Sequence, residues 1–323
     1  MRAIIASLAA LLALPATPAA AEEDPWPLPC ERGCMEAIAG ELLDALANRN
    51  ANQLQLAPNA RYTENGQQML FDNGLWQTGS ELGAYRHVIA DPATGQFGVF
   101  ATLDENGRGV TLAARVRLEH ALIADVEVVT YRVGTGPAWN DAGYAQLEAM
   151  KTPKALWTDT VPPEQRKSRQ ELVQIAAHYF QGIENNDGLG YYPFTDDCDR
   201  LENGTYTTNR PGMIRMGEVD IGGMGCRAQF ETGLYGVVTE VHDRRFPIVD
   251  EERQVVWAHA VFDHCGCKRE LTMPDGTVVP IAGFTRPSSI LLAEAFAIRG
   301  ELIEQVEAVG TSVPYHMGPG WGR

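Results

Sequence analysis

The hexapeptides RYTENG at 61–66 and DRLENG at 199–204 end in the same three residues, and each comes after a helix-like segment and a short polar stretch. A second match lies further along, where LIADVEVV at 122–129 and LIEQVEAV at 302–309 share Leu, Ile, Val, Glu and Val at the same places. Two matched segments in the same order predict that one domain is written twice in this chain, with a longer insertion in the second copy.

The same order of elements is predicted in both copies. Helical spacing of apolar residues predicts helices over 34–48 and 169–183. Alternating runs separated by turns predict strands at 85–89, 97–103, 110–118 and 122–131, and again at 237–249, 255–262, 289–298 and 302–309. The predicted fold class is therefore α+β, with two domains that each combine a helix with a curved antiparallel sheet. We place the domains at 30–150 and 167–323, joined by a proline-containing linker at 151–166.

The first 21 residues have the features of a secretory signal peptide. Arg2 provides a positive charge, residues 4–14 form a short apolar core, and Ala19-Ala20-Ala21 offers a cleavage site before Glu22. The apolar core is too short for a stable transmembrane helix. We expect cleavage after Ala21 and a soluble periplasmic or secreted protein.

The cysteines form an even set, which in an exported chain favours three disulfides. Expected pairs are Cys30 with Cys34 and Cys198 with Cys226, leaving Cys265 and Cys267. A metal-chelating Cys265-Gly-Cys267 is the alternative, although zinc sites usually separate paired cysteines by two or more residues.

A formal net charge of −16 argues against nucleic acid and anionic membranes as partners. The chain has no G-x-S-x-G elbow, phosphate loop, dinucleotide fingerprint or H-E-x-x-H motif. We therefore expect no cofactor and no metal.

Three stretches suggest a family resemblance: HDRRFPIVDEERQVVWAHAVFDH at 242–264, AEAFAIRGELIEQVEAV at 293–309 and VPYHMGPGW at 313–321. They resemble a secreted SnoaL-like family of fungi and bacteria without an assigned activity, whose closing motif reads roughly PYGMPSGW. His316 and Gly318-Pro319 depart from that motif. The resemblance implies two NTF2-like cone domains in tandem, each with an apolar pocket between helix and sheet. It also implies relatives such as ketosteroid isomerase, polyketide cyclases and dehydratases, which place a carboxylate or histidine in an apolar cavity.

Two ionisable residues on apolar strand faces fit that chemistry. Alternation places Glu294 with Leu292 and Phe296, and the equivalent position of the first copy is Ala114. His259 shares its strand face with Trp257. We expect Glu294 and His259 to transfer protons in one pocket of the second domain. A structural ion pair for Glu294 and a hydrogen-bonded core role for His259 are the alternatives.

Further candidates surround this pair. Glu202 is a third catalytic candidate, although its recurrence as Glu64 favours a turn role. Expected substrate contacts come from apolar walls and from polar side chains: Trp257, Phe296, Tyr206, Arg200, Asn203 and Asp263.

The expected function is a cofactor-independent lyase, dehydratase or isomerase acting on a small apolar, aromatic or sugar-derived molecule. The alternative is a non-catalytic binding module for a small ligand or a partner protein. We expect the first copy to bury a sheet face of the second as an intrachain pseudo-dimer, and a homo-oligomer is compatible with this arrangement.

Overall fold

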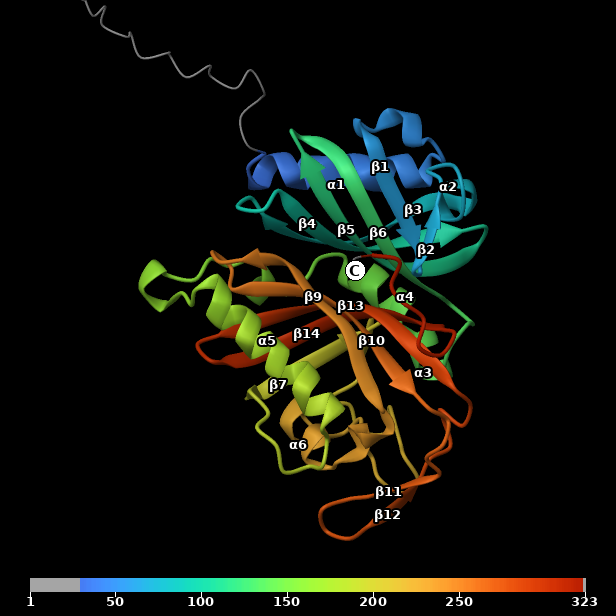
Figure 1. Cartoon of the computed structure of the whole chain (residues 1–323), viewed down its shortest axis with the longest axis vertical. Helices are drawn as coiled ribbons and strands as arrows, with labels where there is room; N and C mark the ends of the chain where they lie inside the picture. The colour runs from blue at the N-terminus through green and yellow to red at the C-terminus, as the bar shows by residue number, and fades with distance from the viewer. Residues whose placement is uncertain (1–29, 322–323) are drawn as a thin grey trace, which may run out of the picture.

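The computed structural model describes residues 30–321, which form two six-stranded mixed sheets, each preceded by a helix (Figure 1). The predicted signal peptide at 1–21 lies outside the described residues. Strand order is β2-β1-β6-β5-β4-β3 in the first sheet and β8-β7-β14-β13-β10-β9 in the second. The two orders are the same apart from numbering, so the chain contains two similar α+β domains.

The first domain begins with the long helix α1 and continues through its six strands. Its elements are α1 (Arg32–Ala47), η1 (Ala51–Gln53), β1 (Leu56–Glu64), β2 (Gln67–Met69), α2 (Leu75–Thr78), β3 (Gly79–Asp91), β4 (Gln96–Glu105), β5 (Arg108–Glu119) and β6 (Leu122–Arg132). Short helices then connect the domains: α3 (Ala138–Asp141), α4 (Gly143–Met150), η2 (Ala155–Trp157) and η3 (Pro163–Gln165).

The second domain repeats this order and adds a small hairpin. Its elements are α5 (Arg169–Glu184), β7 (Phe194–Glu202), β8 (Thr205–Tyr206), α6 (Cys226–Glu231), η4 (Leu234–Val237), β9 (Glu240–Asp250), β10 (Val255–His264), β11 (Glu270–Thr272), β12 (Val278–Pro280), β13 (Ser288–Arg299) and β14 (Leu302–Val313). Helix α5 begins at a capping box, in which Ser168 and Glu171 exchange side-chain and backbone hydrogen bonds.

The repeated Glu-Asn-Gly segments form equivalent hairpin turns between β1 and β2 and between β7 and β8. Asn65 and Asn203 both have positive φ, 50° and 49°. The Asn65 amide donates to the Val128 carbonyl at 2.9 Å, and the Asn203 amide donates to the Ala308 carbonyl at 2.8 Å. A third Glu-Asn-Gly, at 105–107, makes the β4–β5 turn. The tripeptide alone therefore marks a kind of turn, and the shared partners on β6 and β14 establish the equivalence.

The expectation of purely antiparallel sheets is wrong. Strand β1 pairs with β6 in parallel, and β7 pairs with β14 in parallel. Alternation of apolar residues reports which side chains are buried, and it carries no information about the direction of the neighbouring strand.

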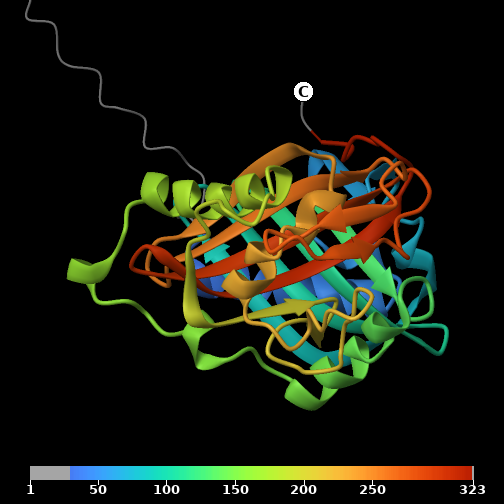
Figure 2. The same cartoon turned by 90° about the horizontal axis from the view of Figure 1, so that it is seen from below.

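The two sheets pack face to face, and a helix covers the other face of each sheet (Figure 1, Figure 2). One hydrophobic core lies between α1 and the first sheet, a second between α5 and the second sheet, and a third between the sheets. The strands nearest the centre are thus covered on both faces, and every residue of β10 is buried. This arrangement gives each buried side chain of the second sheet one of two very different surroundings.

Three disulfides are present, and they are the expected pairs: Cys30–Cys34, Cys198–Cys226 and Cys265–Cys267. The last pair rules out the alternative in which those two cysteines chelate a metal. Within residues 30–321, no helix is long and apolar enough to cross a membrane.

Candidate functional site

The structure places Glu294 and His259 on opposite faces of the second sheet. Cross-strand register pairs Glu294 with Ala258, and His259 with Ala293. Because directly paired residues point to the same face, Glu294 faces α5 and His259 faces the first domain. The expected pocket shared by these two residues is therefore wrong. Periodicity fixed the phase of each strand separately and left the phase between neighbouring strands open.

The expected walls separate in the same way. Phe296 belongs to the core beneath α5, on the Glu294 side. Trp257 belongs to the core between the sheets, on the His259 side, where its ring packs against Phe100 with centroids 4.4 Å apart. Of these two expected walls, Phe296 lies on the side of the sheet that carries Glu294, and Trp257 does not.

Glu294 is a carboxyl group enclosed by apolar and aromatic side chains. It is 2% exposed, and the Tyr179 hydroxyl donates to its Oε1 at 3.1 Å. Its Oε2 has no hydrogen-bond partner among the described residues. Burial and the negative charge of Glu202 raise the pKa of Glu294 to about 8, against the opposing effect of Arg200. At neutral pH the group is therefore mostly a protonated acid.

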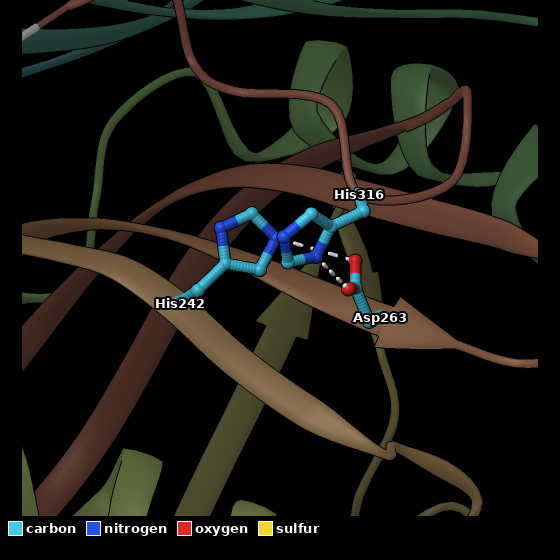
Figure 3. Close-up of side chains that lie close together, drawn as sticks. All are labelled: His242, Asp263 and His316. Carbon is cyan, nitrogen blue, oxygen red and sulfur yellow. Dashed lines mark hydrogen bonds and ion pairs between the residues drawn. The ribbon is translucent and has the colours of Figure 1, made fainter.

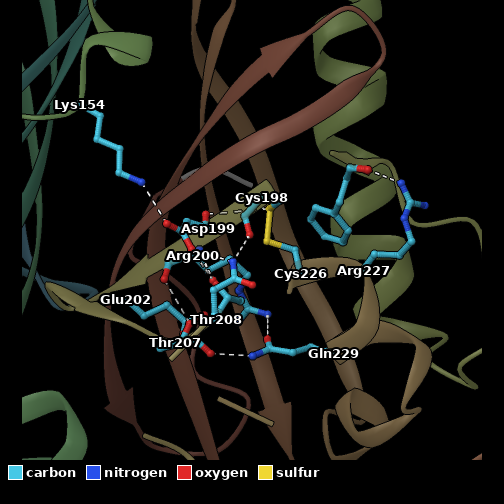
Figure 4. Close-up of a disulfide and its surroundings, with 12 residues drawn as sticks. Lys154, Cys198, Asp199, Arg200, Glu202, Thr207, Thr208, Cys226, Arg227 and Gln229 are labelled. Atoms are coloured by element: carbon cyan, nitrogen blue, oxygen red, sulfur yellow. Dashed lines mark hydrogen bonds and ion pairs between the residues drawn. A yellow bond between two sulfur atoms is a disulfide. The ribbon is translucent and has the colours of Figure 1, made fainter. Parts of the chain in front are cut away.

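Arg200 provides a buried cation that acts on Glu294. Figure 4 shows it beside Glu202, Gln229 and the Cys198–Cys226 disulfide. Its guanidinium contacts the carboxylate of Glu202 and the hydroxyl of Tyr235, and donates to Gln229 Oε1 at 3.1 Å. Arg200 Nε has no partner in the described part of the chain. The Cys198–Cys226 disulfide joins β7 to α6. It therefore links covalently the strand that carries Arg200 to the helix that carries Gln229.

Glu202 connects this buried cluster to the surface. Its side chain is 23% exposed, whereas Arg200 is 6% exposed. The equivalent pair in the first domain is Tyr62 and Glu64, where the tyrosine hydroxyl donates to the carboxylate at 2.8 Å. The contact between positions two apart in this strand therefore recurs. The arginine at the first of these positions is replaced by Tyr62 in the first domain, where Glu64 binds Arg132 instead, with Oε1 and Nη2 2.7 Å apart.

Asn203 and Tyr206 lie away from Glu294. The side-chain Oδ1 of Asn203 accepts a hydrogen bond from the Gly310 backbone amide at 2.9 Å. Asn65 Oδ1 accepts in the same way from the Thr130 backbone amide at 2.8 Å. Tyr206 packs at the core between the sheets, with the Lys154 ammonium 5.0 Å from its ring centroid. The structure therefore gives both residues structural contacts.

His259 is a neutral histidine of the interface between the domains. Trp257 Nε1 donates to its Nε2 at 3.0 Å, and its Nδ1 lies 3.6 Å from Glu127. Burial lowers the pKa of His259 to about 3, although Glu127 acts in the opposite direction. Asp263 is further along β10 and belongs to a separate cluster with His242 and His316.

Sequence reasoning missed three residues of the Glu294 cluster. Tyr179 lies on the buried stripe of α5, together with Leu172 and Phe180, so the helical spacing that predicted this helix could have found it. Gln229 and Tyr235 come from the insertion between β8 and β9, where no periodic pattern points to a buried position.

A groove of about 800 Å³ lies between the first sheet, β9 and the C-terminal segment. Its lining includes Arg61, Arg115, Arg117, Arg245 and Trp321. The guanidinium groups of Arg61 and Arg115 lie 4.2 Å and 4.9 Å from the Trp321 ring centroid. Glu119 and Asp125 also line the groove. Three of its arginines have carboxylate partners, since Arg115 and Arg245 bind Glu127 and Arg117 binds Asp125.

These features define a two-domain α+β protein whose second domain encloses a buried carboxyl group and a buried arginine. The family described as a domain of unknown function (DUF8021) matches residues 165–310, which include Glu294, Arg200 and Glu202. No curated protein is significantly similar to the chain.

Proposed function

We propose that the second domain is a cofactor-independent acid–base enzyme of the lyase, dehydratase or isomerase class. Glu294 transfers the proton in this proposal, and a NTF2-like cone between α5 and the second sheet provides the pocket. Support comes from the carboxyl group itself: Glu294 Oε2 is buried and has no partner within residues 30–321, and the pKa of Glu294 is about 8. General acids and bases work best when their pKa lies near the working pH.

The surrounding groups fit a small molecule that carries an oxygen. Arg200 Nε and Glu294 Oε2 are both buried and unpaired among the described residues. An unsatisfied buried polar atom costs about 1–3 kcal/mol, so a ligand that pairs with both atoms would recover that free energy. In its ionised form, Glu294 would take a proton from a carbon next to a carbonyl group and return a proton to the same or a neighbouring carbon. Arg200 would stabilise the negative charge that develops on the carbonyl oxygen.

The first domain is proposed to be the non-catalytic copy. Ala114 stands where Glu294 stands in the second domain, since Ala114 pairs with Val128 as Glu294 pairs with Ala308. Tyr62 stands in the place of Arg200. The acid and the cation are both replaced, while the strand register around them is retained.

Tyr179 is assigned a positioning role. Its hydroxyl holds Oε1, so Oε2 is the atom left to exchange a proton with substrate. The Glu202 side chain is 23% exposed, against 6% for Arg200, and we place the entrance there. Substrates are expected to be small, because aromatic rings surround the carboxyl: Tyr179 lies 5.0 Å from Phe296 and 5.4 Å from Phe230, between ring centroids.

Proton exchange with solvent tests this function without a known substrate. The chain is incubated in D2O with a panel of small ketones, hydroxyacids and sugar acids, and deuterium at carbon is measured by NMR. We expect exchange into at least one compound class, abolished by Glu294→Gln and retained by Glu218→Gln, which changes an exposed glutamate. Equal exchange by both variants, or none across the panel, would contradict the proposal.

The groove between the domains supports a second candidate function, the binding of a small anionic ligand. Arg61 and Trp321 offer a cationic and a stacking contact, since the Arg61 guanidinium lies 4.2 Å from the Trp321 ring centroid. Calorimetry with small dicarboxylates and inorganic phosphate tests this candidate. Binding that is lost in Arg61→Ala and kept in Glu294→Gln would assign the ligand to the groove and separate the two functions.

Export to the periplasm or the cell exterior is proposed as the location of either function. Three disulfides among the described residues support it, since disulfides persist in oxidising compartments.

A further inference from the structure

His242, Asp263 and His316 gather at one end of the second sheet, on the face opposite Glu294. His242 lies on β9, Asp263 lies on β10, and His316 lies in the segment after β14, as Figure 3 shows. The three can each offer one ligand atom, and these atoms all lie within 4.8 Å of one another. The two imidazole rings are neighbours, with centroids 4.6 Å apart. Segments far apart in the chain thus converge on one carboxylate.

The hydrogen-bond pattern of His242 leaves one contact that neutral groups cannot explain. Its Nδ1 lies 2.8 Å from Asp243 Oδ2, and its Nε2 lies 3.2 Å from Asp263 Oδ1. A neutral imidazole has one N–H and one lone pair, so one of its nitrogens must face a carboxylate oxygen without a hydrogen between them. Either a second proton or a metal ion is needed at that place.

Asp263 is an anchored acceptor. Its side chain is 0% exposed, and its Oδ1 accepts a hydrogen bond from Ser289 Oγ at 2.5 Å. Its Oδ2 lies 2.7 Å from His316 Nδ1. Ser289 Oγ also accepts from the His316 amide at 2.8 Å, so one serine orients both the carboxylate and the backbone of the second histidine.

The charged groups around the cluster favour a cation. Asp243, Asp263 and Glu240 all face it, the last with Oε2 4.0 Å from His316 Nδ1. Two neutral imidazoles would leave three carboxylates without a compensating cation inside the cluster. A divalent ion would balance most of this charge.

We propose that His242 Nε2, the Asp263 carboxylate and His316 Nδ1 bind a divalent transition-metal ion, with Zn²⁺ as the ion to test. Two imidazoles and one carboxylate suit zinc and related metals, whereas Mg²⁺ and Ca²⁺ prefer oxygen ligands. Asp243 would hold the Nδ1–H of His242 and so direct Nε2 to the metal, as outer carboxylates commonly do. His316 is 53% exposed on its side chain, which leaves the site open to a water or a ligand. The site goes beyond the proposed acid–base function and runs against the expectation of no metal.

His316→Gly is the most informative variant. His316 has φ of 58°, a conformation that glycine adopts freely, so this substitution removes the imidazole without adding backbone strain. His242→Ala removes the other ring, and His178→Ala is the matched control because His178 is an exposed histidine on α5. All proteins are prepared with intact disulfides and without a polyhistidine tag.

Equilibrium dialysis with Zn²⁺, followed by metal analysis, gives stoichiometry and affinity, and Co²⁺ absorption spectra report the ligands directly. We expect one ion per chain in the parent and His178→Ala proteins, and a loss of affinity of at least about 100-fold in His316→Gly and His242→Ala. Ca²⁺ should not compete. Absence of Zn²⁺ binding by the parent chain, or equal binding by the parent and His316→Gly, would overturn the proposal and leave the cluster as a proton-sharing histidine–aspartate contact.

Discussion

Glu127 of the first domain binds Arg245 of the second, with Glu127 Oε1 and Arg245 Nη2 2.5 Å apart in the layer between the sheets. The reciprocal contact joins Glu307 of the second domain to His87 of the first, with Oε2 and Nδ1 2.7 Å apart. Glu127 and Glu307 occupy equivalent positions, because they pair with Arg115 and Ala295 in equivalent registers. Each domain therefore presents a buried glutamate to a nitrogen of the other.

The Glu127 contact predicts a large stability effect. Glu127→Ala would leave Arg115 and Arg245 without their shared carboxylate, and removing one partner of a buried pair costs about 3–5 kcal/mol. The control is Glu119→Ala, whose carboxylate is 56% exposed and pairs with Arg117, and which should cost less than about 1 kcal/mol. Urea unfolding measures both. Equal losses in the free energy of unfolding would show that the buried ion pair between the domains contributes no more stability than the exposed pair.

His259 predicts a pH dependence of stability. Burial lowers the pKa of His259 from 6.5 to about 3, so between these values the unfolded chain binds a proton that the folded chain does not. Stability rises with pH wherever the unfolded state binds more protons, so this contribution is complete above pH 6.5 and is lost as pH falls towards 3. The loss should reach roughly 2.7 kcal/mol at about pH 4.5, at about 1.4 kcal/mol for each unit.

A His259→Gln variant isolates that effect, because the amide oxygen can still accept from Trp257 Nε1. Its free energy of unfolding should depend less steeply on pH than that of the parent between about pH 6.5 and 4.5. If the free energy of unfolding depends equally on pH in the two proteins, folding does not lower the pKa of His259.

The disulfides predict unequal contributions to stability. Cys198–Cys226 closes a loop with a sequence separation of 28, whereas Cys265–Cys267 has a separation of 2. Loop-closure entropy gives about 3.5 kcal/mol for the longer loop and about 1.5 kcal/mol for the shorter. Double alanine variants compared by urea unfolding check the order. A larger loss from the Cys265–Cys267 pair would contradict this account.

Tyr179→Phe tests the positioning role of the tyrosine. Its hydroxyl lowers the pKa of Glu294 by donating to the carboxyl group, so its loss should raise that pKa further and cost about 1 kcal/mol of stability. Phe180→Leu, a change in the same helix without a polar contact to Glu294, is the control for packing. Infrared titration of the carboxyl group measures the shift, and an unchanged pKa in Tyr179→Phe would show that the hydroxyl does not act on Glu294.

The repeat and the disulfide pairs could be predicted from the sequence, because both depend on local patterns. Equivalence of Ala114 and Glu294 followed from aligning LIADVEVV with LIEQVEAV, and strand register confirms it. The parallel strands β1 and β7 could not be predicted, since a strand pattern does not report its partner.

The site could be predicted only in part, because a strand pattern also does not report the register with the neighbouring strand. Alternation placed Glu294 with Phe296, and both lie under α5. It could not show that His259 points to the other face of the sheet, because that depends on the register between β10 and β13. Arg245 contacts Glu127, and His316 contacts Asp263, across long separations in sequence. A local sequence pattern cannot predict such contacts.

Infrared spectroscopy of the carboxyl group of Glu294 tests the central claim most directly. The difference between the spectra of the parent protein and Glu294→Gln isolates the carbonyl stretch of one buried carboxyl group. With a pKa raised to about 8 by burial and by Glu202, the band of the protonated acid should be present at about pH 6 and vanish as pH rises through 8. A band of the ionised carboxylate already present at about pH 6 would contradict the account, because Glu294 would then be a buried anion paired with Arg200.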